Sequence, residues 1–400
     1  MSKNCLTLGL LLSLLLCAAC ATQPEPAGEL ELVAELDQAP GNIAVTPDGR
    51  LILSQHPIFR PDIKVVELLP DGSVRPFPNQ AWNSPRDEGG VGFDGVLGIQ
   101  ATADGLVWML DNGRGSSRLV AWDTNRDALH RIIEVGAPAR ARRSFFNDIA
   151  VDPVNGQIII TDASAKHAAL VVVDLKTGSA RRLLEGHPSV QAEPIAMTIG
   201  ERTYAVDRDG KPKASTAVDG ITIDPQSEWV YYGASQSLDL WRVRAADLAD
   251  VSLTAEQLAV RIERYGDRPV CDGITMDGAG NVYITDVTGY AVGVVAPSGE
   301  YRVLYRDEQQ LSWPDGPFAV GATPTLGDCA LGPFIVMLKE NIFANFPEVV
   351  DPTAGDGRLA EWWQALQAHE ACRRNLDHYA VELEKFLKWL RARIAERRGG

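Results

Sequence analysis

The sequence predicts an all-β fold: a six-bladed β-propeller with an incomplete last blade, followed by a short α-helical C-terminal tail. Two observations carry this prediction. A phrase made of an alternating strand, a Gly turn and a second strand that ends in Thr-Asp recurs along the chain, most clearly at residues 270–277 and 280–286. Successive copies begin roughly 40 to 70 residues apart, which leaves room for four short strands in each unit. A ring of such units is a β-propeller.

Each copy of the phrase opens on Asn or Asp, and a second hairpin follows it. The dipeptides Asp71-Gly72, Thr177-Gly178 and Ser298-Gly299 predict tight turns there, because Gly accepts the positive φ that such turns need. The last copy stops after Gly316, so the sixth blade is expected to be incomplete. We expect residues 29–34 to form the outer strand that closes the ring, since an open ring leaves strand edges unpaired. The copies open on Asn42, Asp94, Asn147, Asp219, Asp272 and Asp315.

The chain divides into four predicted segments: a lipoprotein signal peptide (1–20), a tether (21–28), the propeller (29–320) and a helical tail (321–400). An apolar run at residues 6–19 follows a positively charged start and is typical of a secretory signal. Its end, Leu-Cys-Ala-Ala-Cys at residues 16–20, resembles a bacterial lipoprotein signal in which Cys20 becomes the acylated first residue. An ordinary secretory signal is the alternative. We expect a lipid-anchored protein of the cell envelope or extracellular space, attached to the membrane through Cys20.

The composition narrows the choice of partners. The formal net charge of −15 argues against nucleic acid or an anionic membrane surface as the main partner. Beyond Cys20 only Cys271, Cys329 and Cys372 remain, which is not a disulfide framework and contains no Cys-x-x-Cys zinc pair. We therefore expect a monomer that binds a small molecule.

The candidate site is the central channel of the propeller. Inner strands line this channel, so the opening Asn and Asp side chains are expected to converge on one end of it. Calcium prefers six to eight hard oxygen ligands, and Asn147, Asp219 and Asp272 are predicted to hold Ca²⁺ or another divalent cation. The competing interpretation is structural, because Asp and Asn also cap turns in repeat folds. The predicted ligand-binding residues are Asn42, His56, Arg60, Asp94, Asn147, Asp219, Asp272 and Asp315, of which His56 and Arg60 belong to a loop beside the first inner hairpin.

Several phrases of the sequence resemble the yellow/major royal jelly protein family. They are Gly-Asn-Ile-Ala-Val-x-Pro-Asp-Gly-Arg at residues 41–50, Trp-Met-Leu-Asp-Asn-Gly at 108–113, Phe-Phe-Asn-Asp-Ile-Ala-Val-Asp at 145–152 and Trp-Pro-Asp-Gly at 313–316. The resemblance covers about residues 29–316. It implies a secreted six-bladed propeller, which in some members binds small aromatic amines in the central channel.

Relatives in the wider propeller group include calcium-dependent lactone hydrolases such as gluconolactonase. Their metal ligands are a Glu from the first blade, Asn residues from middle blades and an Asp, and Asn147, Asp219 and Asp272 match by position in their units. The first-blade Glu has no match, because this chain has Asn42 there. A metal-dependent lactone hydrolase is thus the alternative function, with Asp272 as its candidate catalytic residue and a metal-bound water as nucleophile.

The tail carries a second resemblance. Residues 325–376, with Thr-Leu-x-Asp-Cys-Ala-Leu-x-Pro-Phe and Arg-Leu-x-x-Trp-Trp, look like the end of the helical domain of glutathione transferases. The half that binds glutathione in that family is absent, so no transferase activity is expected. A propeller joined to such a fragment also raises a third possibility, an inactive truncated fusion.

Overall fold

The computed structural model describes residues 32–86, 90–113 and 116–317. The predicted signal peptide, Cys20, the tether and the glutathione-transferase-like tail all lie outside the described residues. Among those that are described, no helix is both long and apolar enough to cross a membrane.

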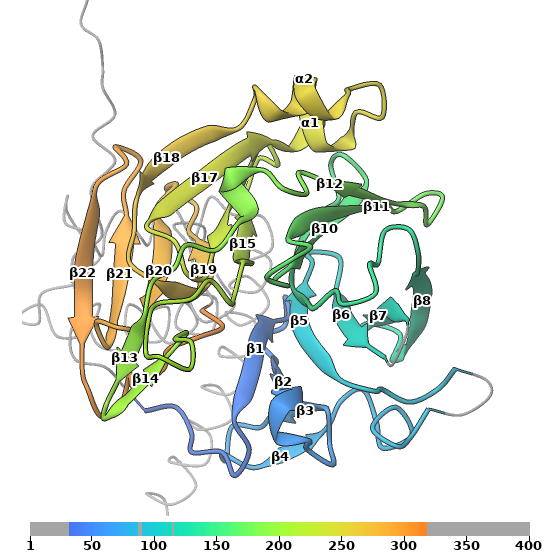
Figure 1. The fold of residues 1–400 in the computed structure, drawn as a ribbon. Coiled ribbons are helices and arrows are strands. Elements are labelled where there is room, and N and C mark those ends of the chain that lie inside the picture. The colour runs from blue at the N-terminus through green and yellow to red at the C-terminus, as the bar shows by residue number, and fades with distance from the viewer. Residues whose placement is uncertain (1–31, 87–89, 114–115, 318–400) are drawn as a thin grey trace, which may run out of the picture.

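Five four-stranded antiparallel sheets, or blades, surround a central channel (Figure 1). Within each blade the strands pair in sequence order from the channel outward. Blade 1 comprises β1 (Pro40–Val45), β2 (Leu51–Gln55), β3 (Val65–Leu68) and β4 (Val74–Pro76). Blade 2 comprises β5 (Val96–Ala101), β6 (Leu106–Asn112), β7 (Ser117–Asp123) and β8 (Ala128–Val135). Blade 3 comprises β9 (Phe146–Asp152), β10 (Gln157–Asp162), β11 (Ala169–Asp174) and β12 (Ala180–Leu183).

Blades 4 and 5 complete the set and carry the shorter elements between them. Blade 4 comprises β15 (Val218–Ile223), β16 (Trp229–Ala234), β17 (Asp239–Arg244) and β18 (Glu263–Asp267). Blade 5 comprises β19 (Cys271–Met276), β20 (Val282–Asp286), β21 (Ala291–Val295) and β22 (Tyr301–Arg306). The remaining elements are the 3-10 turns η1 (Pro57–Phe59) and η2 (Pro188–Val190), the hairpin β13 (Met197–Ile199) with β14 (Arg202–Tyr204), and the helices α1 (Ala245–Ala249) and α2 (Ala255–Ala259). The all-β propeller is confirmed, with five blades in the described residues rather than six.

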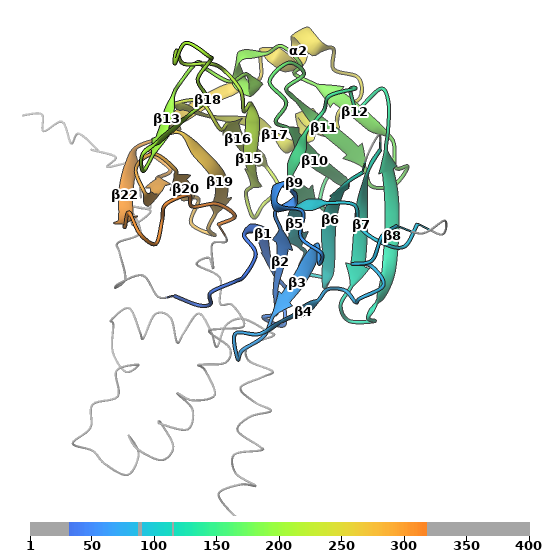
Figure 2. The same cartoon turned by 60° about the horizontal axis from the view of Figure 1, so that its bottom comes forward.

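The chain continues from blade 5 across to blade 1. A Cβ added at Gly273 of β19 would lie 2.6 Å from Pro317 and 2.8 Å from Asp315, while one added at Gly316 would lie 3.0 Å from the Cα of Asn42 in β1. Residues 315–317 therefore stand between the inner strands of blades 5 and 1 (Figure 2). The expected closing strand at 29–34 is not seen, since residues 32–34 have no regular structure and 29–31 lie outside the described residues.

The hydrophobic core fills the spaces between neighbouring blades. Separate clusters lie between blades 1 and 2, 2 and 3, 3 and 4, and 4 and 5. Both faces of a middle strand consequently meet protein, and every residue of β10 is buried. The predicted turn glycines Gly72, Gly178 and Gly299 all have positive φ, as their hairpins require.

A β-bulge near the start of each inner strand shapes the channel. In blades 2 to 5, two residues of the inner strand face one of its neighbour, as between Val218 and Ile221 of β15, which pair with Ala234 and Tyr232. Blade 1 has the same irregularity after Pro40. The bulge places two successive residues of every inner strand at the entrance of the channel. The first of these is Gly41, Leu97, Asn147, Asp219 or Asp272, and the second is Asn42, Gly98, Asp148, Gly220 or Gly273.

Glycine at the second bulge position lets adjacent inner strands approach closely. A Cβ at Gly220 would lie 2.8 Å from the carbonyl oxygen of Asp272 in the next blade. We expect Gly220→Ala to lower the free energy of unfolding by about 1–3 kcal/mol, because backbone atoms cannot move aside as a side chain could. Urea denaturation measures the loss. Gly136→Ala is the control, since a Cβ there meets nothing within 4 Å; equal stabilities of the two variants would contradict the close approach.

Candidate functional site: the acidic mouth of the channel

Asn147, Asp219 and Asp272 occupy equivalent positions in blades 3, 4 and 5, as the repeats predicted. The Nδ2 of Asn147 donates a hydrogen bond to Oδ1 of Asp219. Burial, followed by the charge of the neighbouring Asp272 carboxylate, raises the pKa of Asp219, and burial also raises the pKa of Asp272, against the opposing effects of the Trp313 hydrogen bond and the His56 charge. The three residues predicted to bind a metal lie together at the bulge.

Two of the other residues that open the repeats, Asp94 and Asn42, do not lie at the positions that the repeats suggested. Asp94 precedes β5 and forms an ion pair with Arg86 at 2.7 Å, while Leu97 occupies its blade's equivalent of Asn147. Asn42 is one residue beyond the equivalent position, which in blade 1 is Gly41. Sequence spacing missed both shifts because the start of each bulge depends on pairing with the second strand.

Asp148 belongs to the same cluster but was not among the predicted site residues. Its Oδ1 accepts hydrogen bonds from Nδ2 of Asn42 at 2.9 Å and from the backbone N–H of Ile149 at 2.8 Å. Burial among the inner strands raises the pKa of Asp148 to about 7. The sequence could have pointed to Asp148, because blade 3 has Asp at the second bulge position, where blades 2, 4 and 5 have Gly.

Asp315 and Trp313 complete the mouth from the blade 5 side. The indole Nε1 of Trp313 donates to Oδ2 of Asp272 at 2.6 Å, and the ring of Tyr204 meets that of Trp313 edge-on at 5.3 Å. Asp315 is exposed, and its Oδ1 lies beside Gly273 of β19. Desolvation and the charges of Asp272 and Asp148 raise its pKa. Neither Trp313 nor Tyr204 was among the predicted site residues, because the two are far apart in the chain.

His56 and Arg60 flank the mouth at the end of β2. The Nδ1 of His56 accepts the backbone N–H of Ile58 at 3.1 Å and so caps η1, and burial lowers the pKa of His56 while the charge of Asp272 opposes this shift. Arg60 ends η1 with a φ of 54° and an exposed side chain. His56 thus faces the acidic cluster, whereas Arg60 extends into solvent.

Within the described residues, no Lys or Arg side chain neutralises the acidic cluster. None of the ion pairs formed by Lys or Arg in the described residues involves Asp148, Asp219, Asp272 or Asp315. Desolvation is the largest cause of the raised pKa at each of the four, and repulsion from neighbouring carboxylates adds to it at Asp148, Asp219 and Asp315. Such a group of carboxylates attracts a cation.

The donor atoms of the cluster are of the kind that calcium prefers. Carboxylate and amide oxygens are the ligands that Ca²⁺ prefers. Within the described part of the chain, however, no three Asp, Glu, His or Cys side chains surround a point where a metal ion could be held. The predicted set of Asn147, Asp219 and Asp272 combines one amide with two carboxylates, and metal binding there stays a prediction.

Asp148 gives the protein a characteristic pH dependence. Its folded-state pKa of about 7 lies above the value near 3.9 expected in the unfolded chain. The unfolded state therefore loses its proton first, and the free energy of unfolding should fall as the pH rises from about 4 to about 7. Asp148→Asn should flatten this slope in urea denaturation at several pH values. Asp104→Asn, at an exposed turn between β5 and β6, should not; an unchanged slope in Asp148→Asn would contradict the assignment.

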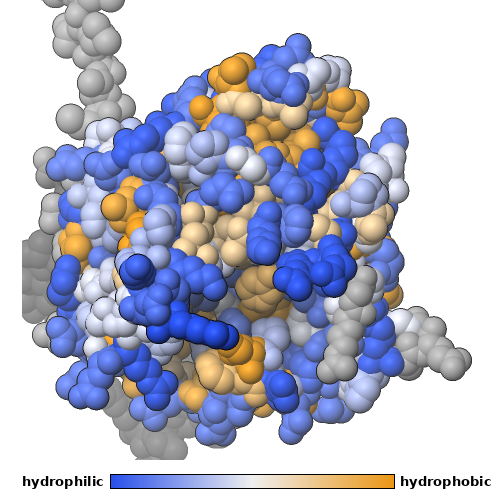
Figure 3. Space-filling model, in the orientation of Figure 1, coloured by the Kyte–Doolittle hydropathy of each residue, from blue (hydrophilic) through white to orange (hydrophobic). Residues whose placement is uncertain are grey.

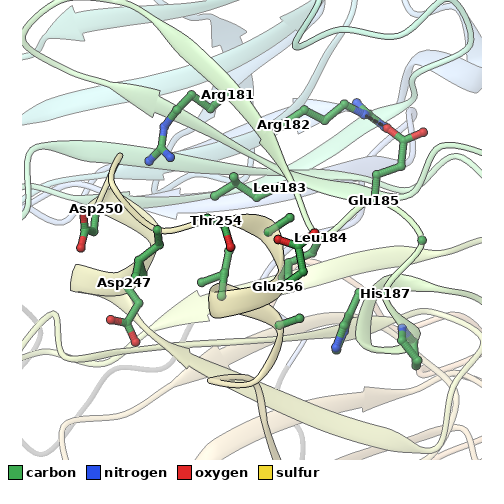
Figure 4. A pocket seen from close by; sticks show the side chains of 16 residues that line it. Arg181, Arg182, Leu183, Leu184, Glu185, His187, Asp247, Asp250, Thr254 and Glu256 are labelled. Carbon is green, nitrogen blue, oxygen red and sulfur yellow. Dashed lines mark hydrogen bonds and ion pairs between the residues drawn. The ribbon is translucent and has the colours of Figure 1, made fainter.

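Two cavities differ in their relation to the cluster. A narrow cavity of about 70 Å³ runs along the channel between Asn42, Asp148 and Pro317. A cavity of this volume suits water rather than a larger ligand. A groove of about 490 Å³ lies away from the mouth, between β12 and the helices α1 and α2 (Figure 4). Two of its carboxylates are neutralised, in the pairs Arg261–Asp247 and Arg182–Glu185. A ligand attracted by the four carboxylates would bind at the mouth.

The face shown in Figure 1 is mostly hydrophilic, with hydrophobic residues gathered over α1 and α2 (Figure 3). Val251 and Val260 of that region are 78% and 84% exposed. The acidic mouth and this hydrophobic surface are therefore separate features.

The aspartates that end second strands accept hydrogen bonds from backbone groups of the neighbouring loops. Asp111 accepts the backbone N–H groups of Asp94 and Gly95, Asp162 accepts that of Phe145, and Asp286 accepts that of Gly289. These bonds hold the loops at the same end of the blades as the channel mouth.

Comparison with known proteins supplies a family. The family described as "Major royal jelly protein" matches residues 95–317, more than half of the 400-residue chain. No curated protein matches the sequence. Solved structures with a similar fold include virginiamycin B lyase from Staphylococcus aureus, at 14% identity and a TM-score of 0.46, covering 73% of this chain and 92% of that one. A gluconolactonase from Xanthomonas campestris aligns at 14% identity and a TM-score of 0.41, covering 67% and 76%. Likenesses this distant carry no argument about activity.

Proposed function

Because the chain belongs to the major royal jelly protein family, we propose that it is an extracytoplasmic propeller that binds a small cationic molecule at the acidic mouth of its channel. The observation that carries the proposal is the convergence of Asp148, Asp219, Asp272 and Asp315 without a basic ion-pair partner. A bound ammonium group would relieve the repulsion among these carboxylates. Trp313, which is 44% exposed beside Asp272, offers a ring face to the same cation.

The test is calorimetric titration of the purified protein with tyramine, which combines an aromatic ring with an ammonium group. The matched control ligand is 4-ethylphenol, which has the same ring and no charge. Tyramine should bind and 4-ethylphenol should not. Equal binding of the two, or no binding of tyramine, would show that the acidic mouth does not recognise an organic cation.

A divalent cation is the second candidate occupant of the mouth. Asn147, Asp219 and Asp272 would hold it through oxygen atoms, and when bound it would polarise a carbonyl group or a water molecule. This is the basis of the alternative function, a metal-dependent lactone hydrolase with Asp272 as the catalytic residue. Gly41 disfavours it, because this residue occupies the first-blade position equivalent to Asn147 and supplies no carboxylate.

The hydrolase alternative is tested with gluconolactone in the presence of calcium, zinc or manganese. Turnover that requires the metal and is lost in Asp272→Asn would replace the binding function with a catalytic one. Absence of turnover with all three metals would eliminate the alternative. The same titrations, without lactone, report whether calcium binds.

We also propose that residues 313–317 begin a sixth blade, since residues 315–317 stand between β19 and β1. This bears on the third possibility, an inactive truncated fusion. Residues 21–322 should unfold in one cooperative transition if the ring closes without the tail. A broad, non-cooperative transition would favour the truncated fusion.

Attachment through Cys20 to the outside of a membrane remains part of the proposal. Expression in a bacterium should yield a protein that partitions into detergent and incorporates labelled palmitate. Cys20→Ser should abolish both properties. Labelling that persists in this variant would rule out Cys20 as the acylated residue.

A further inference from the structure

A long excursion leaves the ring between blades 3 and 4 and is tied down at both ends by one residue. Gln236, whose side chain is fully buried, accepts the backbone N–H of Thr216 at 2.9 Å through Oε1. Its Nε2 donates to the carbonyl oxygens of Ile195 at 2.7 Å and Lys213 at 3.0 Å. The base of the segment 193–216 is therefore anchored firmly to blade 4.

The part beyond this base is the hairpin of β13 and β14, which has little hydrophobic support. All three residues of β14 are exposed. A two-stranded hairpin is only marginally stable by itself, and segments with few buried apolar contacts open at low free-energy cost. The hairpin thus joins a fixed base to a weakly held outer part.

That outer part reaches across to blade 5, as Figures 1 and 2 both show. The backbone N–H of Gly200 donates to the hydroxyl of Tyr290 at 2.6 Å. The Tyr204 ring meets that of Trp313, whose indole N–H bonds Asp272 of the acidic mouth. One aromatic ring therefore separates the hairpin from the carboxylate cluster.

We propose that the hairpin β13–β14 is a lid over the channel mouth, with the contact between Tyr204 and Trp313 as its latch. The lid rests on the proposed function, because it controls access to the same mouth. Opening breaks the Tyr204–Trp313 contact and the bond from Gly200 to Tyr290, while Gln236 keeps the base in place. Closing places Tyr204 against the ring that orients Asp272.

The test compares the full-length protein with Tyr204→Ala and with Arg202→Ala, a control on the same exposed strand. Hydrogen exchange of peptides covering residues 197–204 should be about 3- to 10-fold faster in Tyr204→Ala, the range expected for loss of one aromatic pair. Labelling of Asp272 by a water-soluble carbodiimide with glycine ethyl ester should accelerate by a similar factor. Arg202→Ala should change neither rate, and exchange in the blade strands should be the same in all three proteins.

Each readout can overturn the proposal. Unchanged exchange in Tyr204→Ala would mean that no latch exists, and faster exchange with unchanged labelling of Asp272 would mean that the hairpin does not cover the mouth. Tyr290→Phe provides a second variant, which should also speed exchange of the hairpin by removal of one hydrogen bond. None of these measurements needs a ligand, so failure of tyramine to bind would reject the proposed function separately from the lid.

Discussion

Asp111→Ala should lower the free energy of unfolding by about 3–5 kcal/mol, because it leaves a buried guanidinium without its counter-charge. Asp111 is fully buried. Its carboxylate accepts hydrogen bonds from Nε of Arg118 at 2.9 Å and from the guanidinium Nη2 of Arg86 at 2.7 Å. Arg118 is itself 1% exposed and donates its remaining hydrogens to the carbonyl oxygens of Gly90 and Gly92. The same aspartate thus holds the loop that precedes β5.

Urea denaturation at pH 7 measures this loss. Asp71→Ala, which removes a carboxylate from an exposed turn, serves as the control and should have a much smaller effect. The double variant Asp111→Ala with Arg118→Met should recover part of the stability, since an apolar side chain needs no counter-charge. A single variant as stable as the control would show that the buried ion pair does not form.

Asp219→Asn should have opposite effects on stability and on ligand binding. Asp219 is 3% exposed, and desolvation together with the charges of Asp272 and Asp315 raises its pKa well above the usual range. Asparagine has the same shape without the charge, and its carbonyl oxygen can still accept from Asn147. We expect the free energy of unfolding at pH 7 to rise by about 1 kcal/mol, because the variant removes one member of a repelling cluster. Binding of tyramine should weaken by about 10- to 100-fold with the loss of a charged hydrogen-bond acceptor.

Asp104→Asn is the matched control, since it makes the same change of charge at a turn on the opposite end of blade 2. It should leave both the stability and the affinity for tyramine close to those of the unchanged protein. A gain in stability without weaker binding would place the ligand away from Asp219. Weaker binding without a gain in stability would show that the carboxylates do not repel one another in the ligand-free protein.

The lactone alternative predicts a different pattern for the neighbouring residue. If the protein is a lactone hydrolase, Asp272→Asn should abolish its metal-dependent turnover. If it only binds a cation, Asp272→Asn should weaken the binding of tyramine by the same factor as Asp219→Asn. The two functions are therefore separated by whether the loss at Asp272 requires a metal.

Much of the fold follows from the repeated phrase. The alternation of apolar residues predicts the strands, and glycines such as Gly72 and Gly299 mark the hairpins, because these properties depend on neighbours in the chain. The Asn and Asp residues that open the copies correctly pointed to the channel in blades 3, 4 and 5. The predicted closing strand was wrong where it can be examined, at residues 32–34, because strand formation there requires a partner edge.

The site itself was only partly predictable. The same position of the bulge is occupied by Asn147, Asp219 and Asp272 in three successive blades, so their spacing in the sequence was enough to predict that they lie together. Asn42 and Asp94 do not, because the position of the bulge depends on hydrogen bonds to β2 and β6 rather than on local sequence.

What the sequence determined by itself was the repeated β architecture, the family and an acidic set of inner-strand residues. The tertiary structure decided which carboxylates share the mouth, that Asp148 is among them, and that Trp313 and Tyr204 meet beside Asp272. These contacts join residues between roughly 40 and 170 positions apart, and no local pattern records them. Their energies arise from burial and from charges brought within reach of one another, which only the closed arrangement of the blades creates.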